Sequence, residues 1–421
     1  MVPLLALLAA APLAVPGPVV RVFVGARVID GTGAAPIEDA VFVVSEGRIQ
    51  AIGPRGQVKL PEATYLFDLA GKTVIPGLIN THGHVDETVG LGPWPEVARF
   101  NLLDQLERYA RYGVTTVFSL GGDGPQGFRL RDAGAHGTIG RARLHVSGPV
   151  ITAPSPEEAR ARVDELAARK PDFVKIRVDD NLGAAPKMPP PIYRAVIDQA
   201  RKHGLRVAAH VFYLDDAKGL LEAGVDFIAH SIRDRDVDGE VIRLFKQRDV
   251  CLSPTLMREV STFVYESEPV FFSDPSFLRE ADAAVLAELR EPKRRQSVRE
   301  SRSAQAYKAA LEVASRNLKK LADAGVRIAM GTDTGPPGRF QGYFEHLELE
   351  RMVGAGLTPR QALLSATGEA ARCMGLEGQV GTLRPGAWAD FVVLSGDPLE
   401  DVRRTRAIES VWVGGDAVRR K

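Results

Sequence analysis

His82 and His84 are separated only by Gly83 and follow the apolar run IPGLI at residues 75–79. Side chains alternate between the two faces of a strand, so both imidazoles would point to one side and Gly83 to the other. Imidazole is a ligand that suits zinc and related divalent metals. The triplet is too short to separate a metal site from a turn, so the decision depends on partners elsewhere in the chain.

Further ionisable side chains stand in or after other apolar runs. His210 ends LRVAAH, His230 ends VDFIAH and Asp333 ends VRIAMGTD. Each has an ordinary alternative, as a core histidine or as a turn aspartate before glycine. Lys175 lies inside DFVKIRV, where an unpaired ammonium would be costly to bury. A protonated lysine has no acceptor and cannot ligate a cation, so it does not fit a metal site unmodified.

Short apolar runs carry these residues and define the expected fold. Amphipathic stretches that end in glycine separate most of the runs, as helix C-termini favour. Eight such strand-then-helix units favour an α/β fold of the (β/α)8 TIM barrel type, whose active site lies at the C-terminal ends of the strands. A doubly wound sheet is the competing layout, but no G-x-G-x-x-G motif opens a helix. The runs are residues 78–82, 114–120, 143–148, 172–178, 205–210, 225–230, 250–255 and 326–333.

The ends of the chain differ from its middle. Both ends are rich in short β-type runs, which predicts one small β-sandwich built from residues 18–75 plus 380–421, with the barrel at 76–379 between them. Residues 256–325 form an abnormally long connection, either a functional lid or a solvated surface insertion.

The charge balance and the N-terminal segment indicate which partners and which cellular compartment to expect. The 54 basic and 53 acidic residues nearly cancel, which gives no electrostatic case for nucleic acid or an anionic membrane and favours a small-molecule partner. Residues 1–17 resemble a signal peptide, although no Lys or Arg precedes the apolar run, so we expect an exported protein, and a cytoplasmic one if the segment is not a signal. The run is too short and too rich in proline to span a membrane. The two cysteines form no disulfide framework and leave the compartment open.

Taken together, these motifs resemble the amidohydrolase superfamily of metal-dependent hydrolases. The resemblance rests on His82-Gly83-His84 after PGLINT, Lys175 in VKI, His210 in AAH, His230 in IAHS and Asp333 in GTD, in that order. The tail GTLRPGAWADFVVLSGDPLEDV is similar to the imidazolonepropionase-like and Xaa-Pro dipeptidase-like branch.

The resemblance implies a site with two divalent metal ions, with zinc the expected metal. His82, His84 and Asp333 would hold the first ion, and His210 and His230 the second. Lys175, carbamylated by carbon dioxide, would bridge them. A metal-activated hydroxide would then cleave a C–N bond in a small amide, cyclic amide or dipeptide-like substrate, with Asp333 also moving the proton.

Other expectations are softer. Tyr213, Arg177, Arg233 and His145 are candidate substrate contacts; Arg177 could instead pair with Asp179 or Asp180, and His145 could be a core residue. His136, His203 and His346 are assigned to loop or helix surfaces. The alternatives to an amidohydrolase are a lactone or ester hydrolase with the same centre and a non-catalytic binding protein. Family habit suggests a homo-oligomer.

Overall fold

The computed structural model describes residues 19–62, 64–85, 102–134 and 139–420. The candidate signal peptide and His136 lie outside the described residues. No helix in the described part of the chain combines the length and apolarity needed to cross a membrane.

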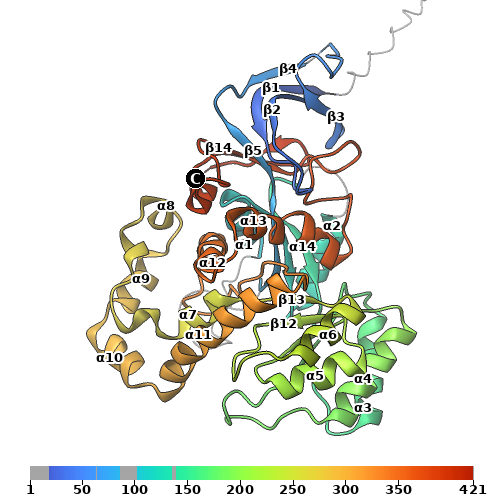
Figure 1. Ribbon diagram of the computed structural model, residues 1–421, viewed down its shortest axis with the longest axis vertical. Coiled ribbons are helices and arrows are strands. Elements are labelled where there is room, and N and C mark those ends of the chain that lie inside the picture. The colour runs from blue at the N-terminus through green and yellow to red at the C-terminus, as the bar shows by residue number, and fades with distance from the viewer. Residues whose placement is uncertain (1–18, 63, 86–101, 135–138, 421) are drawn as a thin grey trace, which may run out of the picture.

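Strands from both ends of the chain share one eight-stranded sheet, at the top of Figure 1. The terminal regions meet where β14 pairs antiparallel with β5. Aromatic packing fills this sheet's core: the rings of Phe23 and Phe42 stack at 4.6 Å and those of Phe391 and Trp412 at 5.6 Å. The strands are β1 (Val20–Val28), β2 (Ile37–Ser45), β3 (Arg48–Pro54), β4 (Tyr65–Asp68), β5 (Thr73–Pro76), β14 (Phe391–Leu394), β15 (Ile408–Val413) and β16 (Asp416–Ala417).

Parallel strands form the middle of the molecule in two further sheets. One contains β6, β7 and β8, and the other contains β9 to β13. Seven of the eight predicted strand runs appear among them. The strands are β6 (Leu78–Gly83), β7 (Val114–Ser119), β8 (Arg143–Val146), β9 (Val150–Ile151), β10 (Val174–Arg177), β11 (Val207–His210), β12 (Phe227–Ala229) and β13 (Cys251–Ser253).

The eighth predicted strand, residues 326–333, is reduced to an isolated bridge between Ile328 and Leu252. Its backbone nevertheless lies between β13 and β6, because Ala329 N–H donates to Leu252 O (2.9 Å) and Thr81 N–H donates to Met330 O (2.9 Å). Asp333 then turns the chain into a left-handed conformation, φ 59°. Because β8 and β9 do not pair and residues 326–333 form only one bridge, the strand ladders of the described residues do not close into one continuous barrel.

Helices alternate with the parallel strands, as the sequence predicts. Several begin at a capping side chain, such as Ser155 and Asp238, and α5 ends at Gly224 with φ 85°. The helices are α1 (Leu102–Arg111), α2 (Pro125–Ala133), α3 (Pro156–Ala167), α4 (Pro190–Lys202), α5 (Leu214–Ala223), α6 (Gly239–Arg248), α12 (Tyr343–Gly354), α13 (Pro359–Ser365) and α14 (Gly368–Met374).

The long connection after β13 is a helical layer on one side of the molecule, yellow to orange in Figure 1. It has an aromatic core of its own, in which Phe277 packs against Tyr343 of α12 at 5.0 Å. Its first helix, α7, carries the buried side chains of Arg258 and Glu259. The connection is therefore more than a solvated surface insertion. Its elements are α7 (Leu256–Phe263), η1 (Val264–Glu266), η2 (Val270–Ser273), α8 (Pro275–Leu278), α9 (Ala283–Leu289), α10 (Pro292–Glu300) and α11 (Arg302–Asp323), and η3 (Val402–Arg406) lies near the C-terminus.

A disulfide joins Cys251 at the start of β13 to Cys373 in α14, so the expectation of no disulfide framework was wrong. The two cysteines are 122 residues apart in the sequence. Only the folded chain brings the strand and the helix together, which is why their spacing gave no signal.

Candidate metal centre

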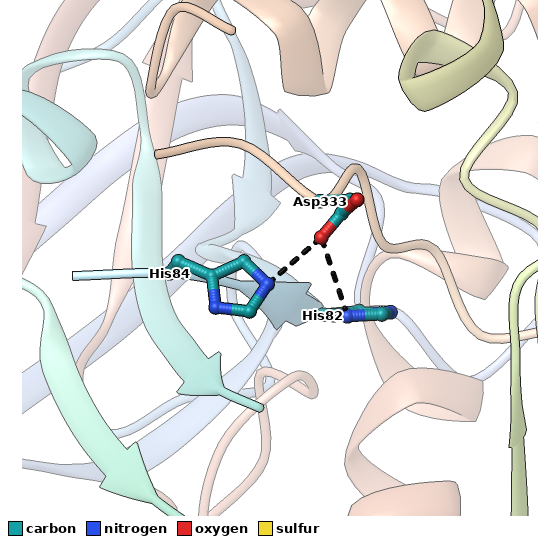
Figure 2. Close-up of side chains that lie close together, drawn as sticks. All are labelled: His82, His84 and Asp333. Atoms are coloured by element: carbon teal, nitrogen blue, oxygen red, sulfur yellow. Dashed lines mark hydrogen bonds and ion pairs between the residues drawn. The ribbon is translucent and has the colours of Figure 1, made fainter. Parts of the chain in front are cut away.

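His82, His84 and Asp333 converge where β6 ends and the chain turns after residue 332 (Figure 2). Asp333 Oδ1 lies 2.8 Å from His84 Nε2 and 3.5 Å from His82 Nε2, and all three side chains are buried. Gly83 faces away from them, as predicted, because a Cβ there would lie 2.8 Å from the Tyr109 hydroxyl. Alternation along β6 thus delivers both imidazoles to one carboxylate.

The geometry of His84 fits a bound cation. Its Nδ1 lies 3.1 Å from the carbonyl oxygen of Gly121, which can only accept, so Nδ1 carries the proton. In a neutral ring Nε2 then presents a lone pair to the Asp333 carboxylate at 2.8 Å. Two lone pairs at that separation repel unless a proton or a metal ion is shared between them. In the described part of the chain, His82, His84 and Asp333 have ligand atoms that all lie within 4.8 Å of one another.

The other predicted ligands adjoin this group. Lys175 of β10 places Nζ 3.2 Å from His82 Nε2. The ring centroid of His230 lies 4.5 Å from that of His82 and 4.0 Å from that of His210. Lys175 and His230 are buried, and the His210 side chain is 12% exposed. The structure therefore brings all six predicted ligands into one cluster.

The charge states of the cluster suit metal ligation. Burial, followed by the nearby Lys175 ammonium, lowers the pKa of His82 well below its usual value. Burial also lowers the pKa of His210 to about 3 although Asp179 opposes it, and that of His230 well below the usual range. Burial alone would raise the pKa of Asp333, but Arg339 and His84 hold it well below normal. Neutral imidazoles and an ionised carboxylate are the forms that bind metal.

Left-handed backbone occurs at three non-glycine residues of this region: His230 with φ 73°, Asp333 with φ 59° and Thr255 with φ 49°. Such conformations are uncommon for side chains with a Cβ and cluster at functional sites. They turn the chain immediately after the strands, so the side chains face the cluster.

Three residues that the sequence did not single out hold the predicted ligands. Asp179 Oδ2 lies 2.6 Å from His210 Nε2, and Thr255 Oγ1 lies 2.7 Å from His230 Nδ1. Arg339 pairs with Asp333 Oδ2 and lines an adjacent cavity of about 200 Å³. The pair of aspartates directly after the fourth strand run was a usable signal for Asp179. Nothing local marked Thr255 or Arg339.

The softer candidates are already engaged by neighbours. Arg177 Nε donates to Asp179 Oδ1 (3.1 Å), which is the alternative role foreseen for it. The Tyr213 hydroxyl donates to Asp180 Oδ1 (2.8 Å). Arg233 is fully buried, with Nε 2.9 Å from Glu259 Oε1.

The histidines outside the cluster have separate partners. His145 stacks on Phe118 at 4.3 Å and its Nδ1 lies 2.9 Å from Asp172 Oδ1, contacts that fit the alternative role of His145 as a core residue. His203 is exposed, as expected. The surface assignment of His346 was wrong, because α12 buries it completely, with Nε2 2.8 Å from Tyr112 O. Helical periodicity alone did not reveal that α12 is covered on this side.

Comparison with known proteins identifies the family. The family model described as "Amidohydrolase family" matches residues 73–418, and the chain belongs to this family. It is 24% identical to an ochratoxinase of Aspergillus niger, over 94% of this chain and 86% of that protein. It is 26% identical to an imidazolonepropionase of Pseudomonas entomophila, over 91% and 92%.

A solved structure of a Xaa-Pro dipeptidase with bound methionine shares the fold. Its TM-score is 0.75 at 22% identity, with 94% of this chain and 99% of that one covered. Family membership and the named relatives support a hydrolase that acts on carbon–nitrogen bonds in small molecules.

Proposed function

We propose that this protein is a binuclear metal-dependent amidohydrolase with a fold of the (β/α)8 barrel type, acting on a small amide, cyclic amide or dipeptide-like substrate. The observation that carries the proposal is the 2.8 Å distance between His84 Nε2 and Asp333 Oδ1. The proton of the neutral His84 ring is on Nδ1, which donates to the carbonyl oxygen of Gly121. That arrangement favours a cation beside the two atoms.

In this proposal His82, His84 and Asp333 hold one ion, His210 and His230 hold the other, and carbamylated Lys175 lies between them. The Nζ of Lys175 supports it, because it lies 3.2 Å from His82 Nε2 inside a buried strand. When bound, two divalent cations, expected to be zinc, supply an acidified water and polarise the scissile carbonyl.

The protein's own residues then orient the reactants and move the proton. Asp333 accepts the proton from the attacking water and returns it to the leaving nitrogen. Arg339 keeps the carboxylate ionised at rest by pairing with Oδ2. Among the substrate-facing candidates, we retain Tyr213, because it directly precedes α5, is half-buried, and its hydroxyl donates to Asp180 Oδ1.

The central test is the metal content of Lys175→Ala. Protein prepared with zinc and bicarbonate should hold two ions per chain, and the variant should lose at least one ion together with activity. Short-chain carboxylic acids should restore part of the activity, because they replace the missing carbamate. Lys202→Ala, at the exposed end of α4, is the control and should match the wild type. Fewer than one ion in loaded wild-type protein would refute the metal proposal.

A substrate panel separates this activity from its rivals. N-acyl amino acids and dipeptides should be cleaved, and lactones should not. Selective lactone turnover would favour the ester or lactone hydrolase, and no turnover by fully loaded protein would favour a binding protein.

We also propose that the protein is exported. The disulfide between Cys251 and Cys373 supports this, because such bonds persist in oxidising compartments. Fractionation of cells that produce the full chain, with detection of the 421-residue product and any shortened form, tests the proposal.

A further inference from the structure

Asp179 lies between two neighbouring strand ends, outside the set of proposed metal ligands. It follows β10 by two residues and is 4% exposed. Its Oδ1 accepts from the Nε of Arg177 and from the backbone N–H of Asn181, both at 3.1 Å. Its Oδ2 lies 2.6 Å from Nε2 of His210. Both carboxylate oxygens are therefore engaged, and the group is held in one orientation.

This contact determines which nitrogen of His210 carries the proton. An ionised carboxylate has only acceptor atoms, so the 2.6 Å approach of Asp179 Oδ2 stabilises the ring with its proton on Nε2. In the described structure no acceptor holds a proton on Nδ1 of His210, whereas Gly121 O does so for His84. The neutral ring then has its lone pair on Nδ1, on the opposite side from Asp179. A carboxylate that holds the second nitrogen of a metal-binding histidine also fixes the ring's orientation and raises its basicity.

We propose that Asp179, braced by Arg177, is a positioning residue that makes Nδ1 of His210 the ligand atom for the second metal ion. This inference rests on the proposed two-metal site. In this inference Arg177 does not contact the substrate. It orients Asp179, which in turn orients His210.

Asp179→Asn places a hydrogen-bond donor instead of an acceptor beside Nε2 of His210 without changing the shape of the side chain. The donors of Arg177 and Asn181 require an acceptor, so the amide oxygen of the new asparagine takes the Oδ1 position. Its NH2 group then faces Nε2 of His210, which must accept, and the proton moves to Nδ1. The wrong tautomer would block ligation, as a misplaced proton disables other histidine sites.

Metal binding and tautomer are measured directly, in addition to activity. Wild-type protein loaded with zinc and bicarbonate should hold two ions by mass spectrometry, and Asp179→Asn should hold one. Nitrogen NMR of histidine-labelled, metal-free protein should show one ring changing tautomer. Asp179→Ala leaves His210 free to turn and should weaken the second ion about 10- to 100-fold.

Asp180→Asn is the matched control, since this neighbouring carboxylate contacts Tyr213 and should leave both ions in place. Circular dichroism checks that each variant is folded. Asp179→Asn or Asp179→Ala that binds two ions with wild-type affinity overturns the positioning role alone. Wild-type protein that never binds a second ion overturns the two-metal proposal and this inference with it.

Discussion

The two carboxylate oxygens of Asp123 have different surroundings. Oδ2 accepts from the backbone N–H groups of Ser147 and Gly148, at 2.9 and 3.0 Å, whereas Oδ1 is buried with no hydrogen-bond partner in the described structure. Burial raises the pKa of Asp123 to about 7, against the hydrogen bonds that lower it. In the folded protein the carboxyl is therefore mostly protonated at pH values below about 7.

This raised pKa gives a testable dependence of stability on pH. A carboxyl whose pKa rises on folding stabilises the protein below its unfolded pKa and loses that contribution as pH rises through the folded value. Metal-free wild-type protein should therefore lose about 1.4 kcal/mol relative to Asp123→Asn between pH 6 and pH 8. Thermal melts of both proteins in EDTA measure the difference. Parallel curves for the two proteins would contradict it.

At the level of single residues, the side chains that meet in the cluster were predictable, and the residues that contact them from outside were not. Five of these side chains stand at the ends of apolar runs, a position that can be read from the sequence. They are His82, His84, His210, His230 and Asp333. The contacts of Asp179 and Thr255 depend on side-chain orientation beyond the strand ends, which local sequence does not determine. Arg339 approaches Asp333 from a loop, where no periodicity predicts direction.

Glu259 of α7 connects the long helical connection to the strand region. Its carboxylate contacts two buried guanidinium groups, Arg233 (2.9 Å) and Arg258 (3.1 Å). Those groups stack on the rings of Phe212 and Tyr307. Removal of the carboxylate would leave two like charges buried without their shared partner. Such uncompensated charges cost about 3–5 kcal/mol.

We therefore expect Glu259→Ala to lower the free energy of unfolding by about 3–5 kcal/mol. Urea denaturation followed by tryptophan fluorescence measures the change. Glu268 pairs with Arg290 and Arg295 at the surface of the same connection, and its side chain is 51% exposed. Glu268→Ala should change stability by less than about 1 kcal/mol. Equal losses in the two variants would show that Glu259 has no special role.

At the level of elements, apolar runs and glycine stops predicted the parallel strands and their helices. The prediction of a full strand for the eighth run was wrong: a single bridge joins Ile328 to Leu252, and the chain turns at Asp333 with φ 59°. The unusual length of the connection after β13 was recognised. The burial of its charged residues Arg258 and Glu259 was not predicted, because it depends on where α7 docks.

At the scale of the whole molecule, similar β-type runs at the two ends correctly indicated a shared sheet, because unpaired strands need partners. The domain boundaries themselves stay predictions. β5 pairs with β14 and ends at Pro76, two residues before β6 begins at Leu78. The joining of the termini therefore fixes where the strand that leads to His82 and His84 begins.

The disulfide also links distant parts of the chain, because it joins β13 to α14 across 122 residues. Both cysteines are buried. A cross-link over so long a segment restricts the unfolded chain, and native disulfides typically contribute about 2–4 kcal/mol. The double variant Cys251→Ser/Cys373→Ser should therefore unfold at lower temperature than the oxidised wild type.

Reductant separates the cross-link from the effect of the substitutions. Dithiothreitol should lower the melting temperature of the wild type towards that of the variant and leave the variant unchanged. Because β13 and α14 flank the segment that ends at Asp333, the variant should also bind its first metal ion less tightly. Thiol titration shows whether dithiothreitol has reduced the wild type. If the reduced wild type melts at the same temperature as the oxidised one, the cross-link is excluded as a source of stability.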